Sequence, residues 1–173
     1  MNHVRGFSKH RKLMLQKSEI LLSLEGTDLL KSIHPKISSI QLEIILGTLL
    51  GDSCIRYRKN VGENTWQIRF GHSVDQLGFL EYLHKELKDI ANPIRLERKE
   101  KDAIIRGIPA KSKDFYAFET VPFKSEMFFK MVTENEKKSV KKDWLKFLTP
   151  LSLAIWYMDD GSYNKSNRVA RFE

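Results

Sequence analysis

The chain has 173 residues, a net charge of +8 and a pI near 9.5; hydrophobic residues make up 41% of it and charged residues 30%. This composition indicates a soluble globular protein rather than a disordered one, with room for one compact domain or two small halves that share a core. A lone cysteine, Cys54, excludes an intramolecular disulfide and a cysteine-rich zinc site, and no apolar run approaches the ~18 residues of a membrane span. We therefore expect an intracellular protein, in a bacterial or phage cytoplasm or an organelle matrix. The excess of Lys and Arg favours a polyanionic partner, although charge alone is weak support.

The first predicted element is a basic leader over residues 1–37, with one short helical stretch, which we interpret as an arm for phosphate contacts. Ser38 and Gln41 then form a capping box, and the apolar segment Leu42–Leu50 follows it. This pattern predicts the first strong helix of the chain.

Two strands are predicted next, over residues 53–58 and 65–71, because apolar and polar residues alternate on both sides of a loop rich in Asn and Gly. Trp66, Ile68 and Phe70 share one face of this hairpin. The other face is polar and cationic, and carries Arg56, Arg58, Gln67 and Arg69.

A second helix is expected over residues 74–90, where leucines recur at helical spacing until Asn92 and Pro93 stop the pattern. Two or three further strands follow it, over residues 94–99, 103–108 and 115–121.

A third helix begins near Lys124, and a lysine-rich connection leads on to the last helix. Thr149 is an N-cap and Pro150 takes the first helical position, so an apolar helix is predicted over Leu151–Asp159.

The segments Ile45–Ser53 and Leu153–Gly161 have a common pattern: an apolar helix whose last turn carries an aspartate, followed by a small residue. If the two helices pack side by side, the carboxylates of Asp52 and Asp160 lie at the same end of the pair. Two carboxylates at two negative helix ends are unfavourable without a cation, and Mg²⁺ prefers such oxygen ligands. The pattern therefore predicts a metal-dependent phosphodiesterase.

Gly47 and Gly51 stand one helical turn apart in the first of these helices, and small residues at this spacing permit close approach of another helix. The second helix has Ile155 and Asp159 in the matching places, so a symmetric helix interface is not expected.

These two segments resemble the two motifs of the LAGLIDADG homing endonucleases, above all those that carry both motifs in one chain. The resemblance covers roughly residues 38–165, and its most specific run is Leu148–Gly161. It implies an α+β fold in which an αββαββα unit is used twice and antiparallel sheets form a DNA-binding saddle. We expect the first unit over residues 38–148 and an incomplete second unit over residues 149–173, with self-association or a complementary C-terminal half supplying the remainder.

The resemblance also implies roles for individual residues. Asp52 and Asp160 match the metal-binding position of the motif, and the backbone carbonyls of Gly51 and Asp159 are further candidate ligands for Mg²⁺ or Mn²⁺. Polar catalytic groups around the metal are expected at His72, Gln76 and Lys124. Contacts to DNA are expected from Arg56, Arg58, Gln67 and Arg69 for base edges, and from Lys111 and Lys113 for phosphates.

The function implied is a site-specific DNA endonuclease that makes metal-dependent double-strand breaks at a long asymmetric site in double-stranded DNA. One alternative is a non-cleaving relative, an intron maturase or regulator that holds intron RNA or DNA; another is an inactive remnant. The cationic strand face has a simpler reading as the solvated side of a half-buried sheet, and His72 as a satisfied strand-end histidine. The sequence leaves open whether the gene lies in an intron, in an intein or alone.

Overall fold

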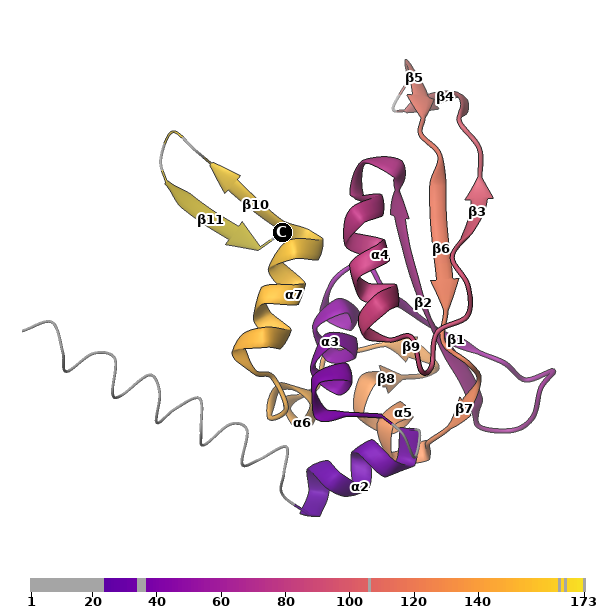
Figure 1. Ribbon diagram of the computed structural model, residues 1–173, viewed down its shortest axis with the longest axis vertical. Coiled ribbons are helices and arrows are strands. Elements are labelled where there is room, and N and C mark those ends of the chain that lie inside the picture. Colours follow the sequence, from indigo (N-terminus) through magenta and orange to yellow (C-terminus); the bar gives the residue numbers. More distant parts are fainter. Residues whose placement is uncertain (1–23, 34–36, 106, 165, 167, 173) are drawn as a thin grey trace, which may run out of the picture. The chain divides into compact units, whose positions relative to one another are not determined.

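The computed structural model describes residues 24–33, 37–105, 107–164, 166 and 168–172 (Figure 1). It divides into two compact units, which we call the helix unit (Met1–Gly51 with Lys124–Glu173) and the sheet unit (Asp52–Phe123). Most of the predicted basic leader lies outside the described residues. In the part of the chain that is described, no helix is long and apolar enough to cross a bilayer.

The sheet unit is built on an antiparallel sheet whose strands follow the order β1-β2-β6-β3. Helix α4 packs against β2 and β6, and a short hairpin, β4 with β5, extends from β3 and β6 (Figure 1). The elements are β1 (Cys54–Tyr57), β2 (Thr65–Ser73), the 3-10 helix η1 (Val74–Gln76), α4 (Leu77–Glu86), β3 (Arg95–Arg98), β4 (Lys101–Ile105), β5 (Ile108–Ser112) and β6 (Phe115–Glu119), followed by β7 (Phe123–Lys124).

The core of the sheet unit is the apolar face that the alternation predicted. Trp66, Ile68 and Phe70 are fully buried, and Leu80 and Leu83 of α4 are buried with them. Burying a side chain of this size stabilises the fold by about 1.5–3 kcal/mol, so the apolar face fixes which side of β2 turns inward. The opposite side of the same strand is thereby left to its polar residues.

For two elements of this unit the predicted bounds were wrong. The single strand expected over residues 103–108 is a hairpin, because the chain reverses at Gly107, whose φ of +81° is a conformation that glycine adopts readily. The helix expected over residues 74–90 begins as η1 and ends at Glu86. The Ile90 N–H then bonds to the Leu87 carbonyl at 2.9 Å, so the chain continues as a tight turn.

The helix unit contains the two motif helices, α3 (Ser39–Leu50) and α7 (Pro150–Asp160), which lie side by side (Figure 1). Its remaining elements are α2 (Leu24–Ile33), α5 (Glu126–Val132), α6 (Lys142–Leu145), and the hairpins β8 (Thr133–Glu134) with β9 (Lys137–Lys138) and β10 (Gly161–Asn164) with β11 (Val169–Phe172).

Both motif helices begin where their caps predicted. The Ser38 side chain accepts a hydrogen bond from the Gln41 N–H at 3.2 Å, and the Gln41 side chain accepts one from the Ser38 N–H at 3.0 Å. Thr149 caps α7 in the same way by accepting from the Ser152 N–H, with Pro150 at the first helical position. These bonds satisfy backbone donors that a helix start otherwise leaves unpaired.

The lysine-rich connection before α6 contains the short β8–β9 hairpin. Asn135 and Glu136 both adopt positive φ, at 50° and 62°, which is the backbone that a tight two-residue hairpin requires. This turn directs Lys138 back along the helix unit. From α3 to α5 the order is αββαββα with the β4–β5 hairpin inserted, so the expected α+β fold class is confirmed.

Candidate functional site

The close contact between α3 and α7 depends on two glycines. A Cβ atom placed on Gly47 would lie 2.5 Å from the Ser152 carbonyl oxygen and 3.0 Å from Ile155 Cβ. One placed on Gly51 would lie 2.8 Å from Asp159 Cγ. The distances of 2.5 Å and 2.8 Å are shorter than real Cβ atoms show, so the helices approach this closely because these positions lack side chains. The predicted close approach at the two glycines is confirmed.

The two motif helices run in the same direction. Gly47 faces the first half of α7 and Gly51 faces its end, so the carboxyl ends of both helices lie together. Asp159 is buried at this end, and Asp160 is the half-buried last residue of α7. Two negative helix ends therefore gather at one point of the helix unit, together with Asp159 and Asp160.

A lysine that the sequence reasoning missed also reaches this point. Lys138 Nζ donates a hydrogen bond of 2.5 Å to the Gly51 carbonyl oxygen, which is itself a predicted metal ligand. An ammonium group here offsets part of the negative field of the helix ends. Lys138 belongs to a run of lysines in the sequence, and only the β8–β9 turn distinguishes it from its neighbours.

In the sheet unit, the structure brings together three predicted site residues. A carboxylate oxygen of Asp52 and a ring nitrogen of His72 lie within 4.8 Å of each other. His72 is buried, and its Nδ1 lies 3.2 Å from Gln76 Oε1. Because a carbonyl oxygen can only accept, Nδ1 is the donor in this contact. The His72 ring also packs against Phe79, with ring centroids 5.3 Å apart.

Lys124 is exposed in β7, at the start of the second segment of the helix unit. Its proposed role stays a prediction.

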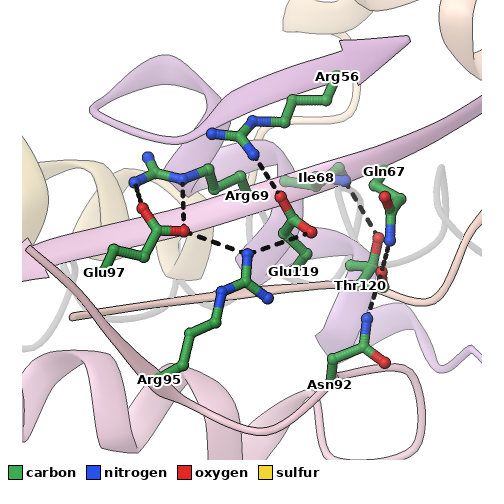
Figure 2. A network of polar contacts seen from close by, with 9 residues as sticks. All are labelled: Arg56, Gln67, Ile68, Arg69, Asn92, Arg95, Glu97, Glu119 and Thr120. Carbon is green, nitrogen blue, oxygen red and sulfur yellow. Dashed lines mark hydrogen bonds and ion pairs between the residues drawn. The ribbon is translucent and has the colours of Figure 1, made fainter. Parts of the chain in front are cut away.

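The cationic face of the hairpin is part of a larger network of arginines and glutamates, drawn in Figure 2. Arg56 Nη1 lies 2.6 Å from Glu119 Oε1, and Arg95 Nη2 lies 3.5 Å from the other oxygen of that carboxylate. Arg95 Nη2 also lies 3.2 Å from Glu97 Oε1, and Arg69 pairs with Glu97. The hydrogen bond between Arg69 and Glu97 raises the pKa of the arginine and lowers the pKa of the carboxyl group.

Strand register explains this network. Arg56 stands opposite Gln67, and Arg69 stands opposite Glu119, so side chains from neighbouring strands emerge on the same side of the sheet. The sequence analysis named Arg56 and Arg69 but not Arg95, Glu97 or Glu119. Arg95 and Glu97 lie in β3 and Glu119 lies in β6. Alternation of polar and apolar residues does not show which strands these two pair with.

The other predicted DNA-contact residues differ in their surroundings. Gln67 is 5% exposed, and its Nε2 donates a hydrogen bond of 2.8 Å to the Thr120 carbonyl; Arg58 is half-buried. Lys111 and Lys113 are exposed. Lys111 pairs with Glu100 at 3.2 Å, and Lys113 pairs with Asp75.

Residues 42–171 match the sequence profile of the LAGLIDADG DNA endonuclease family. The chain belongs to this family. The resemblance inferred from the two motifs is thus confirmed, and the match includes α3 from Leu42 on, the whole sheet unit and α7.

Similar proteins of several kinds contain a related segment. The chain is 28% identical over 167 residues to the probable intron-encoded endonuclease 1 of Wickerhamomyces canadensis, covering 91% of this chain and 68% of that protein. It is 31% identical over 128 residues to the protein RecA of Mycobacterium gastri, covering 74% of this chain. The chain spans only 28% of that RecA protein, so the likeness concerns this segment and not the whole protein.

A solved structure supports the same fold. The homing endonuclease I-WcaI, bound to its DNA recognition sequence, matches with a TM-score of 0.56 and 25% sequence identity. The match covers 87% of this chain and 65% of the I-WcaI chain.

Proposed function

We propose that this protein is a DNA endonuclease that hydrolyses phosphodiester bonds at a specific duplex site with the help of a divalent cation. Family membership supports the reaction class, and the similar structure of I-WcaI, described as bound to its DNA recognition sequence, supports the substrate. The observation that carries the proposal is the parallel packing of α3 and α7 through Gly47 and Gly51, which gathers the carboxyl ends of both motif helices.

Asp52 and Asp160 would hold the cation, with the carbonyls of Gly51 and Asp159 as further ligands. Donor chemistry fits this assignment, because carboxylate and carbonyl oxygens are the ligands that Mg²⁺ and Mn²⁺ prefer. Within the sheet unit, the nearby His72 nitrogen suits Mn²⁺ better than Mg²⁺. A divalent cation here would stabilise the charge that develops on the phosphodiester oxygens.

We propose that four polar side chains support the reaction: His72, Gln76, Lys124 and Lys138. Gln76 holds the His72 ring through Nδ1, which fixes the direction of Nε2. Lys138 donates to the Gly51 carbonyl and so lies beside a proposed ligand. Lys124, which is exposed, keeps its predicted role as a polar group around the metal.

The cationic face of the sheet unit is proposed to contact DNA. Arg56, Arg58 and Arg69 come from β1, the turn after it and β2, and their guanidinium groups would read base edges. Gln67 was also expected to contact DNA, but it is 5% exposed and bonded to the Thr120 carbonyl, so we propose that it supports this face instead. Lys111 and Lys113 belong to the β4–β5 hairpin region, and their exposed ammonium groups suit phosphates.

The test first selects a duplex sequence that the protein binds. The full chain is incubated with a randomised duplex library in Ca²⁺, and the bound sequences are recovered and enriched. The enriched duplex is then incubated with the protein in Mg²⁺, in Mn²⁺ and in EDTA. We expect cutting or nicking with either metal and none in EDTA. Failure to enrich any duplex sequence, or cutting that persists in EDTA, would contradict the proposal.

A second candidate function is RNA binding without cleavage. It is favoured by the likeness to the cytochrome b mRNA maturase bI2 of Saccharomyces cerevisiae, which is 31% identical over 162 residues that cover 85% of this chain and 36% of the maturase. A filter-binding competition between intron RNA and the enriched duplex separates the two. Tight RNA binding with no enriched duplex and no cutting in Mg²⁺ or Mn²⁺ would favour this candidate.

A further inference from the structure

The arginine and glutamate network on the sheet unit joins side chains of β1, β2, β3 and β6 (Figure 2), and Glu119 is its most buried member. The Glu119 side chain is 7% exposed, whereas those of Arg56 and Arg95, which it joins, are 42% and 49% exposed. The Glu97 side chain is 20% exposed, close to the 17% of Arg69, and it joins Arg69 to the more exposed Arg95. Two carboxylates therefore link three guanidinium groups into one ion-pair network, and Arg95 is the arginine that both carboxylates contact.

At the Glu119 end of the ion-pair network, hydrogen bonds hold the backbone of Glu119 and Thr120 in place. The Asn92 N–H donates to the Glu119 carbonyl at 2.8 Å, and the next residue, Thr120, accepts from the side chains of Gln67 and Asn92. The Thr120 hydroxyl also accepts from the Ile68 N–H at 3.1 Å (Figure 2). A short, buried acid on a fixed backbone, such as Glu119, can direct the longer and more exposed arginines that pair with it.

A carboxylate is a poor neighbour for DNA, because it repels phosphates and weakens the field of the lysines and arginines around it. Acids on a face that meets DNA thus lower affinity for every sequence alike. Their compensating effect is geometric: an arginine held by a carboxylate keeps one orientation and loses less side-chain entropy when its remaining N–H groups meet a base edge.

We propose that Glu97 and Glu119 are specificity-determining positioning residues, which orient Arg56, Arg69 and Arg95 for base reading. The inference rests on the proposed DNA-binding function and adds three residues that the sequence analysis did not name. Glu119 orients Arg56 and Arg95; Glu97 orients Arg69 and Arg95. Neither acid contacts DNA itself.

This connectivity predicts a distinctive pattern of base preference. Glu119→Gln should relax the base positions read by Arg56 and Arg95, and Glu97→Gln those read by Arg69 and Arg95. The two variants should therefore share at least one relaxed position, and Arg95→Ala should relax that same position. Each relaxed position should lose about ten-fold of its preference, the size of a typical arginine–guanine discrimination. Affinity for unselected duplex should rise about two- to five-fold, because a negative charge has been removed.

The experiment compares the full-length protein with these variants by selection from a randomised duplex library and by titration of one unselected duplex. The matched control is Glu126→Gln, which removes the same charge from an exposed ion pair with Lys130 on α5. The control should keep the wild-type preference at every position. Thermal melts of all variants accompany the selections, and binding is measured well below each melting temperature.

The outcomes separate the two levels of the proposal. If the wild-type chain enriches no sequence, the proposed DNA-binding function fails. If it enriches a motif that Glu119→Gln and Glu97→Gln reproduce unchanged, the positioning role fails while the function stands. A uniform loss of affinity for all sequences, together with a lower melting temperature, would show that the network only stabilises the sheet. Should Glu119→Gln not fold, the more exposed Glu97→Gln and the Arg95→Ala comparison still decide the question.

Discussion

The side chain of Asp159 occupies the space beside Gly51 that a Cβ at that position would need: the hypothetical atom would stand 2.8 Å from Asp159 Cγ and 2.9 Å from Asp159 Cβ. The end of α3 has no side chain at Gly51, and the Asp159 side chain of α7 fills the space that this leaves. Gly47 and Ile155 repeat this relationship one turn earlier. The contact is thus asymmetric, with small residues on α3 and larger ones on α7, and this brings the acidic end of α7 against the end of α3.

The first prediction concerns this helix contact. Gly47→Ala should lower the free energy of unfolding by about 1–3 kcal/mol, because the new Cβ meets the Ser152 carbonyl oxygen on the α7 backbone, which cannot simply turn away. Gly78→Ala is the matched control. It lies in α4 with nothing within 4 Å of the new Cβ, so it should stabilise by about 0.5–1 kcal/mol. Urea unfolding measures both changes, and equal effects at the two glycines would show that α3 and α7 do not pack in this way.

The second prediction concerns the proposed metal ligands. Asp52→Asn and Asp160→Asn should each slow cleavage of the enriched duplex at least about 100-fold, because a carboxylate ligand contributes several kcal/mol through the cation it holds. Binding of the duplex should be unchanged or tighter, since one repulsive charge toward phosphate is gone. Asp143→Asn, which removes an exposed acid paired with Lys146 on α6, should cut at the wild-type rate. Full activity of either ligand variant in Mg²⁺ would remove that residue from the site.

The third prediction concerns phosphate contacts. Affinity for duplex DNA should fall steeply as salt rises, because bound lysines and arginines release counterions from the DNA. Lys111→Ala and Lys113→Ala should each reduce the slope of log K against log salt by about 1 if the lysine meets a phosphate. Lys85→Ala is the control, because Lys85 is exposed on α4, the helix that packs on the apolar side of the sheet. Slopes that match wild type in all three variants would place the β4–β5 hairpin region away from DNA.

The fourth prediction concerns pH and Glu97. The hydrogen bond from Arg69 lowers the pKa of the Glu97 carboxyl group in the folded protein. Its contribution to stability is therefore complete above the unfolded-state pKa of about 4.3, and is lost as pH falls through the lower folded-state pKa. The free energy of unfolding of the wild type should exceed that of Glu97→Gln near pH 6. The difference should shrink as pH falls below about 4.

Urea unfolding of both proteins at steps between pH 6 and pH 3 measures this difference. A difference that stays constant over the whole range would contradict the ion pair between Arg69 and Glu97.

The sequence by itself determined the parts of the protein that depend on near neighbours in the chain. Ser38 with Gln41, and Thr149 with Pro150, predicted where α3 and α7 begin, because a cap bonds only to residues two or three positions away. Alternation predicted the β1–β2 hairpin and its buried face for the same reason. The paired motifs, being a pattern of residue types, indicated the family and the α+β fold.

Tertiary structure alone decided which distant residues meet. Lys138 reaches the Gly51 carbonyl because the β8–β9 turn points it there, although its neighbours in sequence carry the same charge. Glu119 joins Arg56 and Arg95 because strand order places β6 between β2 and β3, and no local pattern encodes that order. Caps and alternation are short-range properties of the backbone, whereas pairing between strands and between helices is settled by burial of the whole core.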